Sequence, residues 1–393
     1  MPPALVTSTA GQLAVLCGVA SFFFWLERRT ACTLFRYVPP LAWIYLTPLA
    51  LSNFSLVRGR PLLPTRAPLY EALSALVLPM LLVLLLLNVD LASAFRLFGR
   101  GMAVMLCGSL GVVLGAPLGL WIVRHRLEPD AWKAFGALSG SWVGGTGNMA
   151  AVGEMVGAGG TEMGLAVLAD TTCYLIWLPL LLASKGLAGR FARCRPPSAA
   201  AAAEPTEEPP PPPATLPAMA DYLALAAVAA AAAWGAEAAA PLLPVREPYL
   251  AGSSWRILLV TTFGLALSFS PARRIPGSQP LAMALLYLFV AKMGASAALD
   301  RAVEQAAPFL VGAAICLAVH GCCCLAAAWL LRVDLPTAAI ASAANIGGAA
   351  SAPIVALHHR PALVPASVLM ALVGYAVGNY AGYVAALLCR AVQ

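Results

Sequence analysis

Two glycine pairs, Gly144-Gly145 and Gly347-Gly348, interrupt apolar stretches that are otherwise suited to helices in lipid. Glycine weakens a helix and permits a sharp break, which frees backbone N–H and C=O groups from their helical partners. At membrane depth such groups are tolerated around a polar cavity, and in secondary transporters they bind solutes and ions. Small polar residues flank both pairs: Thr146, Asn148, Asn345 and Ser351. We expect these positions to bind an ion or a substrate, with tight helix packing as the alternative role of a glycine pair.

A carboxylate follows the first glycine pair. Asp170 lies about one third of the way into the apolar stretch "MGLAVLADTTCYLIWLPLLL" and is followed by Thr171. Ionisable residues inside spans are costly and are therefore candidates for a functional role. A carboxylate beside unwound backbone carbonyls suits Na⁺, which prefers oxygen ligands, or a proton. We predict that Asp170 carries the coupling ion, Na⁺ or H⁺, with a purely structural buried aspartate as the alternative.

Three further polar residues are candidates for binding an ion or a substrate. Asn379 is an uncharged amide in the last apolar segment. Glu154 follows the first glycine pair and could instead lie at the membrane interface. Lys292 lies in the second half, where it could pair with a carboxylate or extend its ammonium group toward the headgroups.

The composition defines the class of protein in which these residues must work. Of 393 residues, 61% are hydrophobic and 10% are charged, whereas a soluble domain has about 25% charged residues. We predict an all-α polytopic membrane protein in contact with the lipid bilayer, whose net charge of +7 lies in loops near lipid headgroups. No long basic run or interleaved aromatic pattern indicates nucleic acid. The ten cysteines contain no CxxC pair, so the sequence indicates no zinc site, redox dithiol or other cofactor.

The chain divides into two halves. A linker rich in Pro, Ala and Glu at 185–217 separates a transmembrane repeat at 1–184 from a second one at 218–393. Each half contains six apolar segments, which lie near 4–26, 38–57, 67–89, 101–123, 134–153, 162–184, 219–243, 253–270, 280–299, 308–331, 337–357 and 362–389.

The halves also align with each other. "SWVGGTGNMAAV" at 141–152 matches "ANIGGAASAPIV" at 344–355, so that Gly144 corresponds to Gly347. Inverted repeats need an odd number of spans in each half. Five spans plus one glycine-broken segment per half satisfy this condition if each broken segment returns to its own side. Whether 134–153 and 337–357 cross the membrane or re-enter it stays open.

Several stretches of the chain carry a family resemblance: "FWLERRT", "PPLAWIYLTPLALSNF", "GSWVGGTGNMAAV", "LADTTCYLIWLPLLL", "ASAANIGGAASAPI" and "GYAVGNYAG". In these the chain resembles the membrane family catalogued as domain of unknown function 819. That family is grouped with the cation/proton antiporter and anion transporter superfamily, which includes bile acid sodium symporters. The resemblance implies two inverted repeats, a core domain that carries the broken segments, a panel or scaffold domain, and an elevator-like motion.

The same resemblance implies a role for Asp170, because relatives often bind Na⁺ or H⁺ at an acidic residue after the first broken segment. The resemblance also makes a homodimer one of the expected oligomeric states. The host membrane is a plasma membrane or a plastid envelope, and the sequence does not decide between them.

We therefore predict an ion-coupled secondary transporter for a small polar solute, with an organic anion as the expected solute class. A cation/proton antiporter without an organic substrate is the first alternative. An intramembrane enzyme and a passive channel are alternatives of other classes. The enzyme is disfavoured because aspartyl proteases need two facing aspartates, whereas the sequence places only Asp170 deep in a span.

Overall fold

All regular elements in the described part of the protein are helices, as predicted. The computed structural model describes residues 4–29, 40–55, 59–194, 216–246, 251–297 and 299–393. Eight of its helices are long and apolar enough to cross a membrane, and Gly252–Leu267 is a shorter apolar helix. The protein is an integral multi-pass membrane protein.

The helices of the first half correspond to the predicted apolar segments. They are α1 (Thr9–Arg29), α3 (Pro40–Asn53), α4 (Pro68–Ala72) with a π-helical segment (Leu73–Val77) and α5 (Leu78–Leu86), α6 (Leu91–Val123), α7 (Ala131–Gly144), α8 (Thr146–Met155) and α9 (Gly160–Ala183). After α9, the basic part of the predicted linker is helical as α10 (Ala188–Cys194), and residues 195–215 lie outside the described part.

The second half follows the same order of long, short and broken helices. It comprises α12 (Met219–Ala239), α13 (Gly252–Leu267), α14 (Ser278–Ser296), α15 (Leu299–Leu331), α16 (Leu335–Asn345), α17 (Gly348–His359) and α18 (Val364–Val392). Each glycine pair lies where the sequence analysis expects a break, between α7 and α8 and between α16 and α17.

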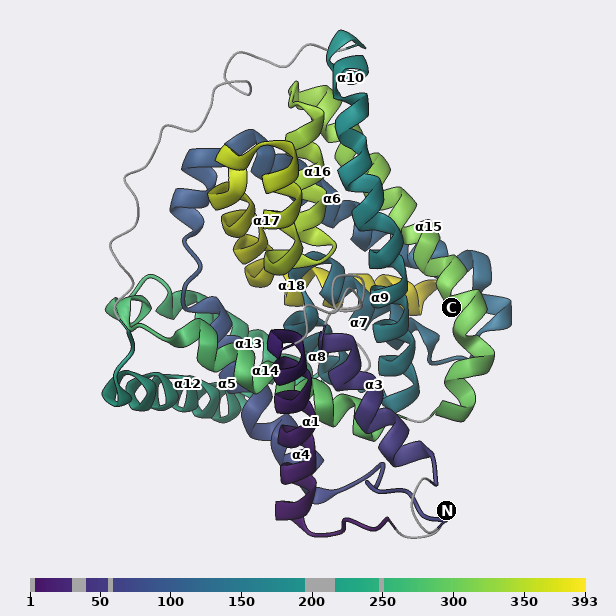
Figure 1. The fold of residues 1–393 in the computed structure, drawn as a ribbon, viewed down its shortest axis with the longest axis vertical. Helices are drawn as coiled ribbons and strands as arrows, with labels where there is room; N and C mark the ends of the chain where they lie inside the picture. The colour runs from purple at the N-terminus through teal and green to yellow at the C-terminus, as the bar shows by residue number, and fades with distance from the viewer. Residues whose placement is uncertain (1–3, 30–39, 56–58, 195–215, 247–250, 298) are drawn as a thin grey trace.

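The helices form two groups in space. In Figure 1, α6, α9, α15, α16 and α17 occupy the upper part, and α1, α3, α4, α5, α12, α13 and α14 occupy the lower part. The α6 and α15 helices pack against each other along much of their length, and α14 packs on α3 and α5. The α7, α8 and α18 helices lie where the groups meet, with α8 and α18 contacting α5 and α13.

Close glycine contacts hold the meeting helices together. A methyl group placed on Gly382 of α18 would lie 2.7 Å from the Cα atom of Gly140 in α7. In the upper group, Gly119 of α6 abuts the backbone of Gly312 in α15. Small residues allow this approach in lipid, where helices associate through van der Waals contact.

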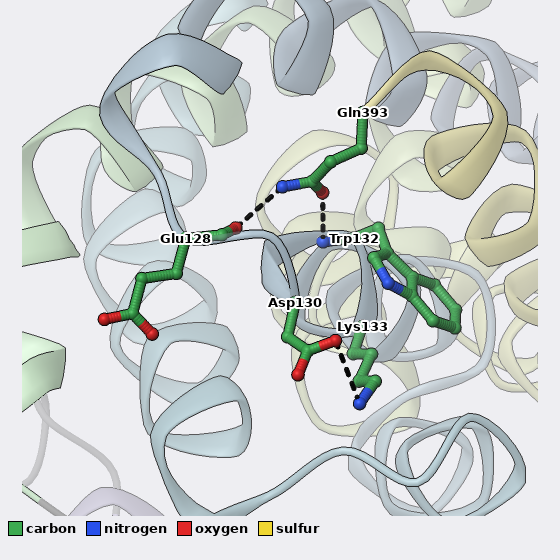
Figure 2. Close-up of polar contacts among 5 residues, drawn as sticks. All are labelled: Glu128, Asp130, Trp132, Lys133 and Gln393. Carbon is green, nitrogen blue, oxygen red and sulfur yellow. Dashed lines mark hydrogen bonds and ion pairs between the residues drawn. The ribbon is translucent and has the colours of Figure 1, made fainter.

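The start of α7 is joined to the end of α18, as Figure 2 shows. The backbone N–H of Trp132 donates to Oε1 of Gln393 at 2.9 Å, and Nε2 of Gln393 donates to the Glu128 carbonyl at 2.7 Å. The side chain of Gln393 thereby satisfies an amide in the first turn of α7 that has no partner within the helix. Asp130 forms an exposed ion pair with Lys133 at 3.1 Å.

Both broken segments fold back on themselves. Gly145 adopts φ +80°, and α8 then returns along α7, so that Val152 lies against both Gly140 and Gly382. In the second segment Gly347 has φ +114° and Gly348 has φ +61°, and α17 lies beside α16 (Figure 1). Glycine adopts these positive angles without strain from a Cβ atom. The structure therefore favours the re-entrant form, which the sequence left open.

Candidate functional site

The two breaks meet at one cavity of about 390 Å³. We call it the break cavity. Its lining comes from both broken segments, from α9 and α18, and from α1, α3, α5 and α14. Six of the predicted site residues beyond Asp170 lie on its wall: Gly145, Thr146, Thr171, Gly347, Gly348 and Ser351.

The α9 helix brings the charged group to this cavity. Asp170, Thr171 and Tyr174 all line it, since residues four apart share one face of a helix. The Asp170 Oδ1 atom accepts a hydrogen bond from the Ser141 hydroxyl at 3.1 Å. Asp170 takes part in none of the ion pairs found among the described residues.

Ser141 connects this carboxylate to the first break. Its carbonyl accepts a hydrogen bond from the N–H of Gly145 at 2.6 Å, at the point where α7 ends. Its hydroxyl donates to Asp170 at the same time. The position of the carboxylate and the shape of the break therefore depend on one residue.

Two tyrosines, Tyr174 of α9 and Tyr375 of α18, also line the break cavity. The Ser351 hydroxyl donates to the Tyr174 hydroxyl at 2.8 Å, which links α17 to α9. The Tyr375 ring lies against both breaks: a methyl group on Gly145 would be 3.0 Å from it, and one on Gly348 would be 3.7 Å away. Glycine at these positions leaves room for the ring, which is half-buried at the cavity wall.

Asn148 and Gly144 lie outside the lining. The Asn148 amide donates to the Tyr375 carbonyl at 3.0 Å and so joins the first hairpin to α18. Gly144 is buried where a methyl group would meet the Asn148 side chain and the Gly374 carbonyl. Both residues shape the hairpin tip, and neither reaches the break cavity.

Asn345 and Asn379 also bridge helices. The Asn345 amide donates to the Met105 carbonyl at 2.9 Å and accepts from the Ser109 hydroxyl at 3.2 Å. The Asn379 amide donates to the Thr261 hydroxyl at 2.7 Å, and its Oδ1 atom is buried without a partner. Both asparagines are fully buried and away from the lining of the break cavity.

Glu154 and Lys292 lie together in another place. They line a second cavity of about 500 Å³, the polar cavity, with Arg66, Glu162 and Ser296. A third cavity shares Arg66, Glu154 and Lys292 and adds Arg256.

The charged groups of the polar cavity are partly neutralised. Glu154 lies 3.6 Å from Arg256, and the Lys292 ammonium donates to the Ser74 hydroxyl at 2.8 Å above the Phe289 ring. Of the two roles left open for Lys292, the structure gives it a hydroxyl partner rather than a carboxylate.

His320 is buried in α15, and both of its ring nitrogens have hydrogen-bond partners. The His320 Nδ1 atom lies 2.9 Å from the Gly108 carbonyl, and Nε2 lies 2.8 Å from the Ser342 hydroxyl, which accepts from Trp177 at 2.9 Å. Because a carbonyl can only accept, Nδ1 carries a proton, and Ser342 donates to Nε2 in the neutral ring. The arrangement agrees with a packed neutral histidine.

Among the wall residues that the sequence analysis did not select as sites, four carry a carboxylate or a phenol: Glu27, Tyr174, Tyr287 and Tyr375. The position of Tyr174 follows from Asp170, four residues earlier on the same helix. The other three come from α1, α14 and α18, and no local pattern singles them out.

Oxygen atoms dominate the polar part of the break cavity. The Asp170 carboxylate and the hydroxyls of Ser141, Thr146 and Thr171 line it, and hard cations such as Na⁺ prefer this type of ligand. Among the described residues, no group of three or more His, Cys, Asp or Glu side chains could hold a metal ion. A lining of this kind could hold an alkali cation or a proton.

Comparison with known proteins gives one family. The family model described as "Protein of unknown function (DUF819)" matches residues 14–392. The chain is also 26% identical over 350 residues to "Uncharacterized membrane protein YjcL" of Bacillus subtilis (strain 168), which covers 85% of this chain and 87% of that protein.

Proposed function

Because the chain belongs to the DUF819 family of membrane proteins, and because both its helix breaks meet one half-buried carboxylate, we propose that it is an ion-coupled secondary transporter. It binds a small polar solute in the break cavity and exposes that cavity alternately to the two sides of the membrane. The observation that carries the proposal is the convergence of Gly145, Gly347 and Asp170 on one cavity.

The coupling ion binds at Asp170. A carboxylate with one hydroxyl partner in a membrane protein gains strongly from a cation or a proton, because an unpaired charge at low dielectric is costly. Ser141 and Thr171 supply neighbouring oxygens for Na⁺, or the carboxylate alone takes H⁺.

The helix order supports two inverted repeats. If the shorter helices α3 and α13 also cross the membrane, they and the eight long apolar helices make ten spans, five in each half, and each half adds one re-entrant hairpin. An odd number of spans reverses the second half relative to the first, as in transporters with inverted repeats. The upper group with α7, α8 and α18 then moves as the core against the lower group.

The function is not enzymatic in this proposal. Ser139 donates to the carbonyl of Phe135 in its own helix, Ser141 donates to Asp170, and His320 is held by Gly108 and Ser342. These side chains are thus arranged as helix contacts rather than as a nucleophile with its base. A cation/proton antiporter without an organic solute is the second candidate, since the Asp170 carboxylate alone would support it.

Thermal unfolding of the purified protein tests the ion site. We expect Na⁺, compared with K⁺, or a lower pH to raise the melting temperature, because a ligand at 100 times its Kd stabilises the native state by about 2.7 kcal/mol. Asp170→Asn should abolish this rise. Asp130→Asn is the matched control, since it makes the same change at an exposed ion pair.

Proteoliposomes then separate the two candidates. Dissipation of a pH gradient by Na⁺ or K⁺ alone indicates the antiporter, whereas a requirement for solute indicates coupled transport. Ion effects that are equal in wild type and Asp170→Asn would refute the coupling role.

A further inference from the structure

We propose that the solute of the break cavity is an organic cation, whose ammonium group pairs with Asp170 and whose apolar body is enclosed by aromatic rings. This inference rests on the proposed function and names its substrate class. It differs from the organic anion that the sequence suggests.

The charges around the cavity are of one sign. Among the described residues that line it, Asp170 and Glu27 are carboxylates, and none is Lys, Arg or His. An anion would meet two like charges there without a basic partner, and like charges repel each other. A cation would instead compensate the charge on Asp170, which accepts a hydrogen bond from the Ser141 hydroxyl and forms none of the ion pairs found among the described residues.

Basic side chains near the hairpins gather elsewhere. Arg66 and Lys292 line the polar cavity, and Arg256 lies beside Glu154 in the cavity that adjoins it. None of the three lines the break cavity. Near the hairpins, an anion would therefore find basic partners at the polar cavity and not at the place where the two breaks converge.

The helix ends at the breaks do not favour an anion. A single helix N-terminus attracts negative charge through its free N–H groups. In each re-entrant hairpin, however, the C-terminus of one helix adjoins the N-terminus of the next, at Gly144 and Thr146 in the first and at Asn345 and Gly348 in the second. The partial charges of opposite sign therefore offset each other, and the carboxylates determine the field.

Aromatic rings provide the second feature of a cation site. Phe24 of α1 and Tyr287 of α14 form an edge-to-face pair with ring centroids 4.5 Å apart, and both line the cavity. Tyr174 and Tyr375 line it from α9 and α18, where Ser351 and the two breaks hold them. Ring faces attract ammonium groups, and clusters of such rings are the usual binding sites for quaternary ammonium ions.

The proposal defines how solute and coupling ion interact. Asp170 is one carboxylate, so that an ammonium group and a Na⁺ ion or proton compete for it. When either cation binds, it neutralises the carboxylate, and the carboxylate then no longer attracts the other cation. Transport is then an exchange, in which the organic cation moves in one direction and Na⁺ or H⁺ moves in the other.

Two sets of isosteric probes test the charge preference. The first is choline, 3,3-dimethylbutan-1-ol and 3,3-dimethylbutyrate, and the second is benzylammonium, benzyl alcohol and benzoate. Binding is measured by calorimetry on the full chain in nanodiscs at low Na⁺. We expect the cation of at least one set to bind about tenfold or more tightly than its neutral isostere, and the anions to bind most weakly. Added Na⁺ or H⁺ should weaken cation binding.

Variants distinguish binding in the break cavity from binding elsewhere. Asp170→Asn should remove the cation preference, whereas Asp130→Asn should retain it. Because Asp170→Asn could fail to fold, Tyr287→Leu and Tyr287→Phe form a second pair. Loss of the ring should weaken cation binding by about 2- to 30-fold, and Tyr287→Phe, which keeps the ring, should weaken it less than Tyr287→Leu.

The outcomes separate this inference from the function on which it rests. If neither cation is preferred, or if an anion binds best, the substrate class is wrong, while a Na⁺ or pH effect that needs Asp170 still supports the transporter. If neither ions nor probes respond to Asp170→Asn, both proposals fail.

Discussion

Replacement of Gly382 by alanine should destabilise the protein through one contact that holds the first hairpin in place. An added methyl group would lie 2.7 Å from Cα and 2.8 Å from N of Gly140, and 2.8 Å from a methyl group of Val152. Ordinary carbon contacts begin at about 3.5 Å. Two of these neighbours are backbone atoms of α7, so that the overlap cannot be relieved by a side-chain rotation.

The expected cost follows from two opposing effects. Overpacking a close contact costs about 1–3 kcal/mol, whereas alanine in a helix gains about 1 kcal/mol over glycine. The overlap with backbone atoms puts Gly382 at the upper end of the first range, so we expect a net loss of about 1–2 kcal/mol. Gly18→Ala in α1 is the matched control, since nothing lies within 4 Å of the added methyl group. It should gain up to about 1 kcal/mol.

Tryptophan fluorescence during heating in one detergent gives the order of stability. We expect Gly382→Ala to unfold below the wild type and Gly18→Ala at or above it. The ion-dependent rise in melting temperature should also shrink in Gly382→Ala, because α7 carries Ser141 and thereby orients Asp170. A Gly382→Ala protein as stable as Gly18→Ala would refute the packing of α7 on α18 described above.

Two further substitutions test the second hairpin. Asn345→Ala removes the amide that donates to the Met105 carbonyl and accepts from the Ser109 hydroxyl, and it should cost about 1–3 kcal/mol in denaturant unfolding because these groups are buried. Asp334→Ala removes the side-chain oxygen that accepts from the N–H of Thr337 at 2.9 Å at the start of α16. Its free energy of unfolding should be about 0.5–2 kcal/mol lower than that of Asp334→Asn. The asparagine variant loses the same charge but retains a side-chain oxygen that can cap α16.

The positions of the helices and of the breaks could be predicted from the sequence. The apolar segments 134–153 and 337–357 each become two helices, and the turn falls at the glycine pair in both. Positive φ angles at Gly145, Gly347 and Gly348 explain why glycine marks the place, since other residues are strained there. The sequence did not predict whether the chain continues across the membrane after the break or folds back as a hairpin. Both forms place the same glycine at the break.

The roles of the asparagines were less predictable. Asn148, Asn345 and Asn379 were expected to be binding residues because they are polar residues in apolar surroundings. Each instead bridges helices, and the partners Tyr375 and Met105 are more than 200 residues away from Asn148 and Asn345 in sequence. A polar residue in an apolar segment can either bind a ligand or bridge two helices. Only the tertiary structure distinguishes these two roles.

One available signal was missed. In α7, glycine recurs at 136, 140 and 144, and in α18 it recurs at 374, 378 and 382. Glycine at intervals of four lines one face of a helix, and in membranes this pattern indicates close helix packing. The same spacing recurs in α6 at 111, 115 and 119, so the pattern identifies closely packed helices without saying which ones pair, and it gives Gly144 a packing role.

The contacts between the core and α13 indicate how freely the proposed motion can occur. Four polar contacts join α13 to α8 and α18: Ser254 with Met155, Arg256 with Glu154, Thr261 with Asn379, and Thr262 with Tyr380. Each such contact contributes about 0.5–1.5 kcal/mol in net terms, so together they contribute about 2–6 kcal/mol. Two conformations of a working protein differ by a few kcal/mol, so that both are populated.

The four polar contacts of α13 therefore stabilise the conformation seen here, but not so strongly that a second conformation with a shifted core is excluded. Within the moving part, by contrast, the close glycine contacts and Asn148 hold α7, α8 and α18 together. The hydrogen bond from Ser141 of α7 ties Asp170 of α9 to this unit, so that Asp170 and Tyr375 keep their geometry. Glu27 and Tyr287 belong to helices outside that unit. A shift of the core would then separate one carboxylate and two rings of the lower group, Phe24 and Tyr287, from Asp170. A bound cation would lose part of its enclosure in that step, and this loss would favour its release or its replacement by the coupling ion.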